Sequence, residues 1–346
     1  AAYMPFILLI IKIYIKKLIS KVYKSIMKIL AVQNRMGIGD TVIFLPYIQA
    51  ISEKFKTPVS LLVKKNSKAE EFLNQSNYID KIIILERTKK KDSRHNGILG
   101  SLKLVKDLKN YKFDKIFIFN SSLRFNLIAR LAGIKEIYQY PLFKKKNQHI
   151  IQPALDLIKQ RLDLKINSNP EIQINKDLVK DSISKFQIKS DDLNILLGIG
   201  GSEPSKRIPS KTFLSVMEKI NNLRSCKFFL ATGKNKDEQL ILDEIMSSKF
   251  KEKCVPLDEL SISQTLPIIK NCNISICNDT SFSHLSSALG IKTITLMADT
   301  PLIYGSYCSN MYPIIPDGET TVDHNTLGKD KINPEKIFEK LISILN

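Results

Sequence analysis

The sequence contains no tryptophan, only 13 glycines and 14 prolines, and no long uninterrupted hydrophobic run. This composition excludes collagen-like and low-complexity chains. The most apolar stretch, near the N-terminus, is interrupted by Lys12 and is too short to cross a bilayer. The 346 residues, 43% of them hydrophobic, instead suit a globular protein with two cores of ordinary size.

Cysteines are few and follow no metal-binding pattern. There is no CxxC motif, no histidine at ligand spacing, and an odd total of five. This argues for free thiols in a reducing compartment and against a structural zinc or a disulfide framework. No DxD-type acidic pair is present to hold a divalent metal, so we expect no metal and no cofactor. The cysteines are Cys226, Cys254, Cys272, Cys277 and Cys308.

Acidic residues are outnumbered, 34 against 53 lysines and arginines, which gives a net charge of +19. Such a balance attracts nucleic acid, membrane headgroups or phosphorylated substrates. General lysine enrichment is an alternative, because the lysines are spread along the chain. The basic residues form no patch interleaved with aromatics, so no nucleic-acid partner is expected.

Residues 1–27 predict a basic amphipathic helix. Ile15, Leu18, Ile19, Val22 and Ile26 share one helical face, and lysines occupy the opposite one. Such a helix would lie in a membrane interface with its lysines toward anionic headgroups. Two alternatives stay open: a helix packed on the protein body, or sequence upstream of a start at Met27. No small-residue cleavage site follows, which argues against a cleaved signal peptide.

From residue 28 onward, β-branched runs alternate with amphipathic stretches, the pattern of parallel α/β units. A helix, a polar connector and another helix at 150–190 separate two such series. We therefore predict two doubly wound, Rossmann-like domains facing across a cleft, 28–170 and 171–346. Strands are expected at 28–33, 58–64, 81–86, 115–120, 136–140, 194–199, 226–232, 273–278 and 293–298, first-domain helices at 40–55, 67–76, 101–109 and 123–132, and basic loops at 87–100 and 141–149.

Ligands of such sheets bind beyond the carboxyl ends of strands. The first such loop, "GIGDTV", carries Asp40 between a strand and a helix. A dinucleotide-binding turn is disfavoured, because Val42 replaces the third glycine and "VKKN" ends the next strand without an acid. The turn either delivers the Asp40 carboxylate to the cleft or uses it as a helix N-cap.

Three later loops complete the candidate site. "GIGGSEPSKRIP" lacks the Walker GK[ST] ending, but its glycines and Lys206 suit a diphosphate, with a plain basic turn as the alternative. "ATGKNKDE" offers Asp237 or Glu238 to ribose hydroxyls or as helix caps. "NDTSFSH" brings Asp279 and His284 to a helix start, where backbone amides bind anions. A purely structural role for His284 stays open.

Together these four loops resemble glycosyltransferase family 9, the heptosyltransferases that use ADP-heptose in the lipopolysaccharide inner core. The matching stretches are "MKILAV…GIGDTVIFLP", "GSEPSKRIP", "GKNKDE" and, for the family's Asp-Thr-Gly-x-x-His, residues 279–284, and the similarity covers 27–346. Two departures concern the donor: Ser281 replaces a glycine and Ile208 an aromatic residue.

The resemblance implies a GT-B fold with the acceptor on the first domain and the nucleotide-sugar on the second. It makes Asp40 the catalytic base of an inverting, metal-independent transfer to an anionic glycolipid or glycan. We then expect a cytoplasmic enzyme held peripherally at the inner membrane; a nucleotide-sugar epimerase or a non-catalytic membrane-surface binder are the alternatives. The implied donor-site residues are Ser202, Lys206, Asp237, Asp279, Thr280, Ser281, Phe282 and His284, and those expected beside Asp40 are Arg35, Gly37 and Gly39.

Overall fold

The computed structural model describes residues 27–88, 93–142 and 150–346. The expected N-terminal helix, apart from Met27, lies outside the described residues. So do 89–92 and 143–149, which are parts of the two expected basic loops.

The first domain is a five-stranded parallel sheet in the order β3-β2-β1-β4-β5, which confirms the five strands expected there. Its strands are β1 (Ile29–Val32), β2 (Val59–Lys64), β3 (Ile79–Leu85), β4 (Lys115–Ile118) and β5 (Glu136–Gln139). Its helices are α2 (Ile38–Phe55), α3 (Ala69–Leu73), α4 (Gly97–Tyr111), α5 (Leu123–Leu131) and α6 (Gln152–Leu162). Helix α4 begins at Gly97, four residues earlier than expected, with Asn96 as its N-cap.

The second domain is a six-stranded parallel sheet in the order β11-β10-β9-β6-β7-β8. Its strands are β6 (Leu193–Gly198), β7 (Cys226–Ala231), β8 (Cys254–Pro256), β9 (Ile274–Asn278), β10 (Thr293–Leu296) and β11 (Met311–Ile314). Its helices are α7 (Lys176–Lys185), α8 (Ser210–Leu223), α9 (Lys236–Met246), α10 (Ile262–Lys270), α11 (Ser281–Ala288) and α12 (Pro334–Leu345). The edge strands β8 and β11 were not expected from the sequence.

Both faces of each sheet are buried, as expected for parallel sheets covered by helices. Along β1, Ile29 and Ala31 join one apolar cluster while Leu30 and Val32 join another, because side chains alternate along a strand. The first cluster continues from α2 into α11 and the second sheet, so one apolar core spans the domain interface.

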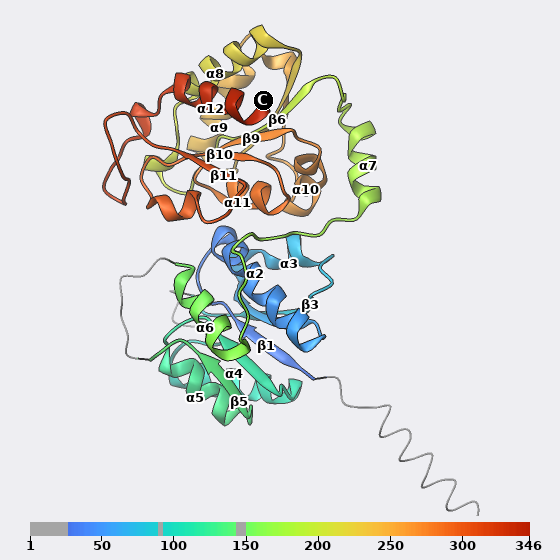
Figure 1. The fold of residues 1–346 in the computed structure, drawn as a ribbon, viewed down its shortest axis with the longest axis vertical. Coiled ribbons are helices and arrows are strands. Elements are labelled where there is room, and N and C mark those ends of the chain that lie inside the picture. Colours follow the sequence, from blue (N-terminus) through green and yellow to red (C-terminus); the bar gives the residue numbers. More distant parts are fainter. Residues whose placement is uncertain (1–26, 89–92, 143–149) are drawn as a thin grey trace, which may run out of the picture.

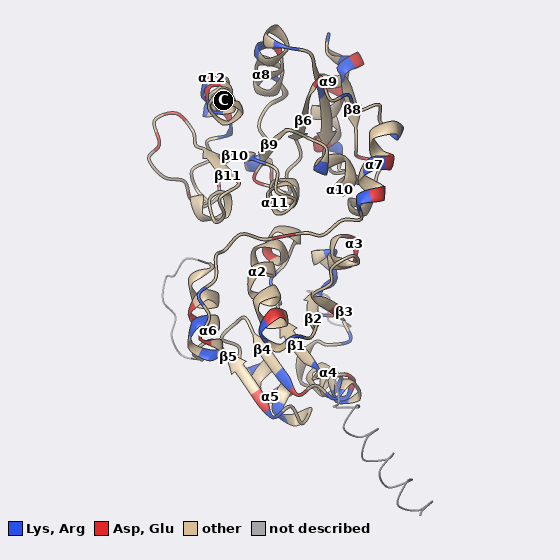
Figure 2. Cartoon of the chain, turned by 45° about the vertical axis from the view of Figure 1, so that its right-hand side comes forward, with Lys and Arg blue, Asp and Glu red and all other residues tan. Residues whose placement is uncertain are grey.

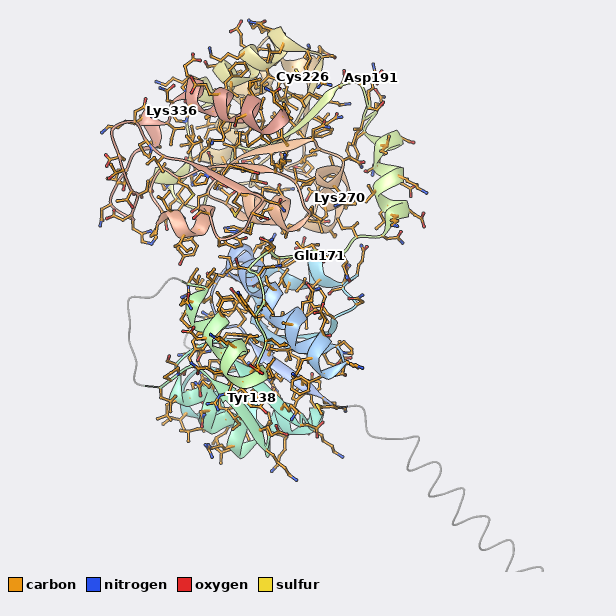
Figure 3. All side chains as sticks on the ribbon, in the orientation of Figure 1. Tyr138, Glu171, Asp191, Cys226, Lys270 and Lys336 are labelled. Atoms are coloured by element: carbon orange, nitrogen blue, oxygen red, sulfur yellow. The ribbon has the colours of Figure 1, made fainter. Side chains whose placement is uncertain are left out.

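Residues 163–175 connect the lobes, running between α6 and α7 where the two lobes meet (Figure 1). The expected boundary at 170/171 falls in this connector. The Ile172 amide donates to the Ala288 carbonyl at 2.9 Å, which ties the connector to the end of α11. In Figure 3, Tyr138 lies in the first domain, Cys226 in the second, and Glu171 at the junction between them.

Lysines and arginines lie on elements of both domains rather than on one (Figure 2). None of the helices in the described residues is both long and apolar enough to cross a membrane.

Candidate active site

A cleft of about 760 Å³ lies between the domains, where the loops that follow the strands face one another. Helix α2 of the first domain faces α11 of the second at this junction (Figure 1). Predicted residues from both domains line the cleft, namely Gly37, Gly39, Asp40, Ser202, Lys206, Asp279, Thr280, Ser281, Phe282 and His284. The four loops singled out in the sequence therefore form one site.

Asp40 is the third residue of α2, and its carboxylate does not cap the helix. The N-cap is Gly37, whose φ of 107° is a conformation that favours glycine, and no side chain caps the amides. The N-cap interpretation of Asp40 is therefore wrong. Gln33 Nε2 instead fixes this turn by donating to the Asp40 carbonyl at 2.9 Å.

Burial raises the pKa of Asp40 above its usual value, and the nearby Asp279 carboxylate adds to this. Arg35 opposes the rise, with Nη1 3.7 Å from Asp40 Oδ1, although Arg35 is half exposed and the attraction is weakened by solvent. Arg35 also donates to Tyr304 Oη of the second domain at 3.4 Å. The result is a carboxyl group that holds a proton more readily than an ordinary aspartate.

Across the cleft, Lys206 Nζ lies 3.0 Å from Asp279 Oδ2. Both side chains are largely buried, 16% and 7% exposed, and such charges are tolerated because they are paired. The charges of both influence the Asp40 carboxyl group, so base candidate, lysine and second acid share one local field.

Helix α11 presents its N-terminus to the same cleft. Its N-cap, Thr280, makes no side-chain cap bond, so the amides of the first turn are not capped by it. Ser281 and Phe282 follow in the first turn. Amides at a helix start, beside a lysine, attract a phosphate.

The profile of "Glycosyltransferase family 9 (heptosyltransferase)" matches residues 101–308, more than half of the chain. The chain belongs to this family. It is 23% identical over 325 residues to lipopolysaccharide heptosyltransferase 1 of Campylobacter coli, covering 87% of this chain and 92% of the relative. A family 9 glycosyltransferase from Veillonella parvula superposes with a TM-score of 0.75 at 17% identity, covering 92% and 97% of the two chains. The E. coli ADP-heptose lps heptosyltransferase II gives 0.70 at 18%, covering 92% and 98%.

Of the two acids just after the Gly233 turn of this family 9 glycosyltransferase, Glu238 lines the cleft, not Asp237 as expected. Asp237 is 65% exposed, pairs with Arg207 Nη1 at 2.7 Å and does not line the cleft. Glu238 is buried and accepts from the Gly201 amide at 2.6 Å. Adjacent helical positions point about 100° apart, and packing selected the second one.

Sequence reasoning missed several cleft residues. Asn66 and Lys68 follow β2, and Asp258 follows the unexpected strand β8. Thr300 and Tyr304 follow β10, and His324 follows the unexpected strand β11. The rule that placed the first four loops would have found Asp258 and His324, had both edge strands been recognised. The loops after β2 and β10 follow strands that were expected, but they carry no glycine-rich turn and were overlooked.

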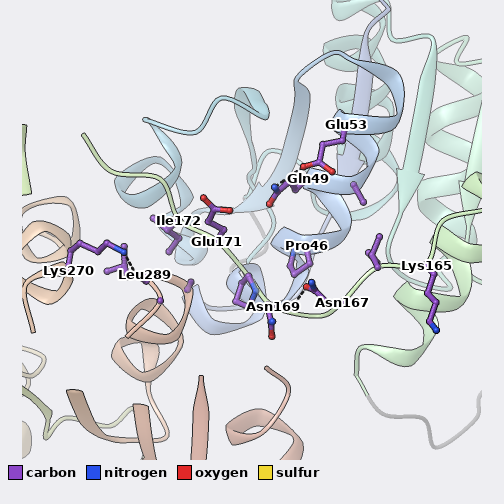
Figure 4. Close-up of a pocket in the computed structure, with 15 residues that line it drawn as sticks. Pro46, Gln49, Glu53, Lys165, Asn167, Asn169, Glu171, Ile172, Lys270 and Leu289 are labelled. Atoms are coloured by element: carbon purple, nitrogen blue, oxygen red, sulfur yellow. Dashed lines mark hydrogen bonds between the residues drawn. The ribbon is translucent and has the colours of Figure 1, made fainter. Parts of the chain in front are cut away.

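A second cavity of about 680 Å³ lies among the connector, the later turns of α2 and the end of α11 (Figure 4). It contains none of the predicted site residues. Its Glu53 accepts from Gln49, and Lys270 donates to the Leu289 carbonyl. Because the predicted site residues line the cleft and none lines this cavity, the cleft is the candidate active site.

Among the described residues, no group of histidine, cysteine, aspartate and glutamate side chains is arranged to hold a metal ion. All five cysteines are free and buried, as their spacing predicts.

Proposed function

We propose that this glycosyltransferase moves heptose from ADP-heptose to an anionic glycolipid acceptor of the lipopolysaccharide type, with inversion and without a metal ion. The observation that carries the proposal is the meeting of Asp40 with Lys206 and Asp279 in one interdomain cleft. The relatives support the donor and the pathway: their names specify ADP-heptose and lipopolysaccharide.

Asp40 acts as the general base. A sugar hydroxyl is a poor nucleophile until a carboxylate in hydrogen-bond reach takes its proton. The raised pKa of Asp40 makes its carboxylate a stronger base than that of an ordinary aspartate. As the proton moves to Asp40, the hydroxyl oxygen bonds to the anomeric carbon from the face opposite the nucleotide.

The bond from the anomeric carbon to the diphosphate oxygen breaks at the same time, and its electron pair stays on the diphosphate. Lys206 and the start of α11 stabilise this charge in place of a metal ion. Ser202 lies on the facing glycine loop, beside the diphosphate, and Asp279, Ser281 and Phe282 line the same donor pocket. Glu238 replaces Asp237 as the acid that contacts the nucleoside.

The acceptor occupies the first-domain side, next to Asp40 and Arg35. A phosphorylated or carboxylated glycolipid is attracted by the chain's positive charge. We place the enzyme in the cytoplasm, peripheral to the inner membrane, with residues 1–27 as the attachment.

The test incubates the full chain with ADP-heptose and glycolipid extracted from a heptose-deficient strain. Mass spectrometry should show one added heptose, NMR an inverted anomeric centre, and excess EDTA no loss of rate. Epimerised sugar nucleotide released without acceptor would support an epimerase instead.

Asp40→Asn should lower kcat by 10²- to 10⁴-fold, because the amide cannot take the proton. Its affinity for ADP, measured by calorimetry, should stay within about threefold of that of the unaltered enzyme, since neither the Lys206–Asp279 pair nor α11 is altered. Full turnover by Asp40→Asn would exclude Asp40 as the base.

A further inference from the structure

Gly39, the residue before Asp40, touches the ring of His284 across the domain interface. A Cβ atom on Gly39 would lie 2.4 Å from His284 Cδ2 and 2.6 Å from Nε2, closer than atoms approach. The backbone of Gly39 is not in the left-handed region, so it would accept any L-residue. The requirement for glycine therefore comes from the histidine ring.

His284 is fixed from its other side by Tyr307. Its Nδ1 lies 3.0 Å from Tyr307 Oη, and the two rings stack with centroids 5.6 Å apart. Burial lowers the pKa of His284 to about 4, so the ring is neutral at neutral pH. Only 5% of the residue is exposed, and Nε2 is 3.9 Å from Asp279 Oδ1, beyond hydrogen-bond distance.

A neutral, largely buried ring that Tyr307 holds in place is a rigid spacer. It stands between α11, which carries the donor-side groups, and the first turn of α2, which carries Asp40. The two helices pack against each other across the interface. The thickness of the ring thus sets how far the first turn of α2 stands from Asp279 and Lys206.

We propose that His284 is a positioning residue that sets the distance between Asp40 and the donor site through its contact with Gly39. This inference rests on the proposed function, in which Asp40 is the base. A displacement of about 1 Å of a reacting group can reduce turnover about 100-fold, so the spacer acts on kcat rather than on nucleotide affinity.

The test is a double-mutant cycle with Gly39→Ala and His284→Asn. Alanine is the better helix former, so helix propensity does not oppose Gly39→Ala, and the atoms nearest to the added Cβ belong to the His284 ring. We expect kcat to fall about 100-fold, with ADP affinity within about threefold. His284→Asn alone should lower kcat about tenfold, because the shorter side chain leaves the turn unsupported.

The double variant should regain at least tenfold in kcat over Gly39→Ala, because asparagine vacates the space that the new Cβ needs. Ser286→Ala is the matched control on α11: its buried hydroxyl has no hydrogen-bond partner, and its kinetics should match the unaltered enzyme. Simple multiplication of the two losses would overturn the proposal, as would lost ADP binding with normal kcat in His284→Asn.

Melting temperatures separate this inference from the proposed function. Gly39→Ala should lower the melting temperature and His284→Asn should restore part of it, whatever reaction the protein performs. If the unaltered chain transfers no heptose, the proposed function fails. The melting temperatures of the single and double variants still test the contact between Gly39 and His284. No recovery in the double variant would then overturn the spacer.

Discussion

At the scale of single residues, burial raises the pKa of the candidate base Asp40, and one half-exposed arginine, Arg35, opposes the rise. Arg35→Met should therefore raise that pKa and move the acid limb of the kcat/KM profile to higher pH. We expect turnover to fall more at the acid end of the profile than at its alkaline end.

Arg35→Lys should keep most of the effect, since it retains a positive charge. Tyr304→Phe is the control for the other bond of Arg35, which crosses to the second domain. An unchanged pH profile in Arg35→Met would mean that Arg35 does not influence the base.

At the scale of elements, α11 contributes both to the proposed donor site and to the core. Leu285 is fully buried in the apolar cluster that spans the interface, so Leu285→Ala should lower the free energy of unfolding by about 2–5 kcal/mol. Leu240→Ala, at a half-exposed position on α9, should change it by less than about 0.5 kcal/mol. Urea titrations would measure both, and equal midpoints would contradict the shared core.

The elements that sequence reasoning found are those with a strong local pattern. Central strands such as β6 and β9 are rich in aliphatic residues and buried at every position, because both of their faces are covered. The edge strands β8 and β11 have only three and four residues, and each contains a proline. Local pattern limited the prediction of the site in the same way. The strand and glycine turn before Asp40 were enough to place it in the cleft, whereas the choice of Glu238 over Asp237 depended on packing.

At the scale of the whole molecule, the positive charge and residues 1–26 predict attachment to an anionic surface. Each lysine near such a surface contributes about 1 kcal/mol, and salt screens the attraction. The full chain should float with vesicles containing anionic lipid at low salt, and a chain lacking residues 1–26 should not. Turnover of a water-soluble acceptor should be equal in both. Equal flotation would refute the attachment, and vesicles of zwitterionic lipid serve as the control.

The apolar cluster shared by α2 and α11 also limits how substrates can enter. Pulling the lobes straight apart would expose this surface to water at about 25 cal/mol for every Å². A rotation of one domain against the other about the contact line of α2 and α11 would admit ligands while keeping this apolar surface buried. In such a rotation the proposed base Asp40, which lies on α2, would move less than residues far from the contact between the two helices.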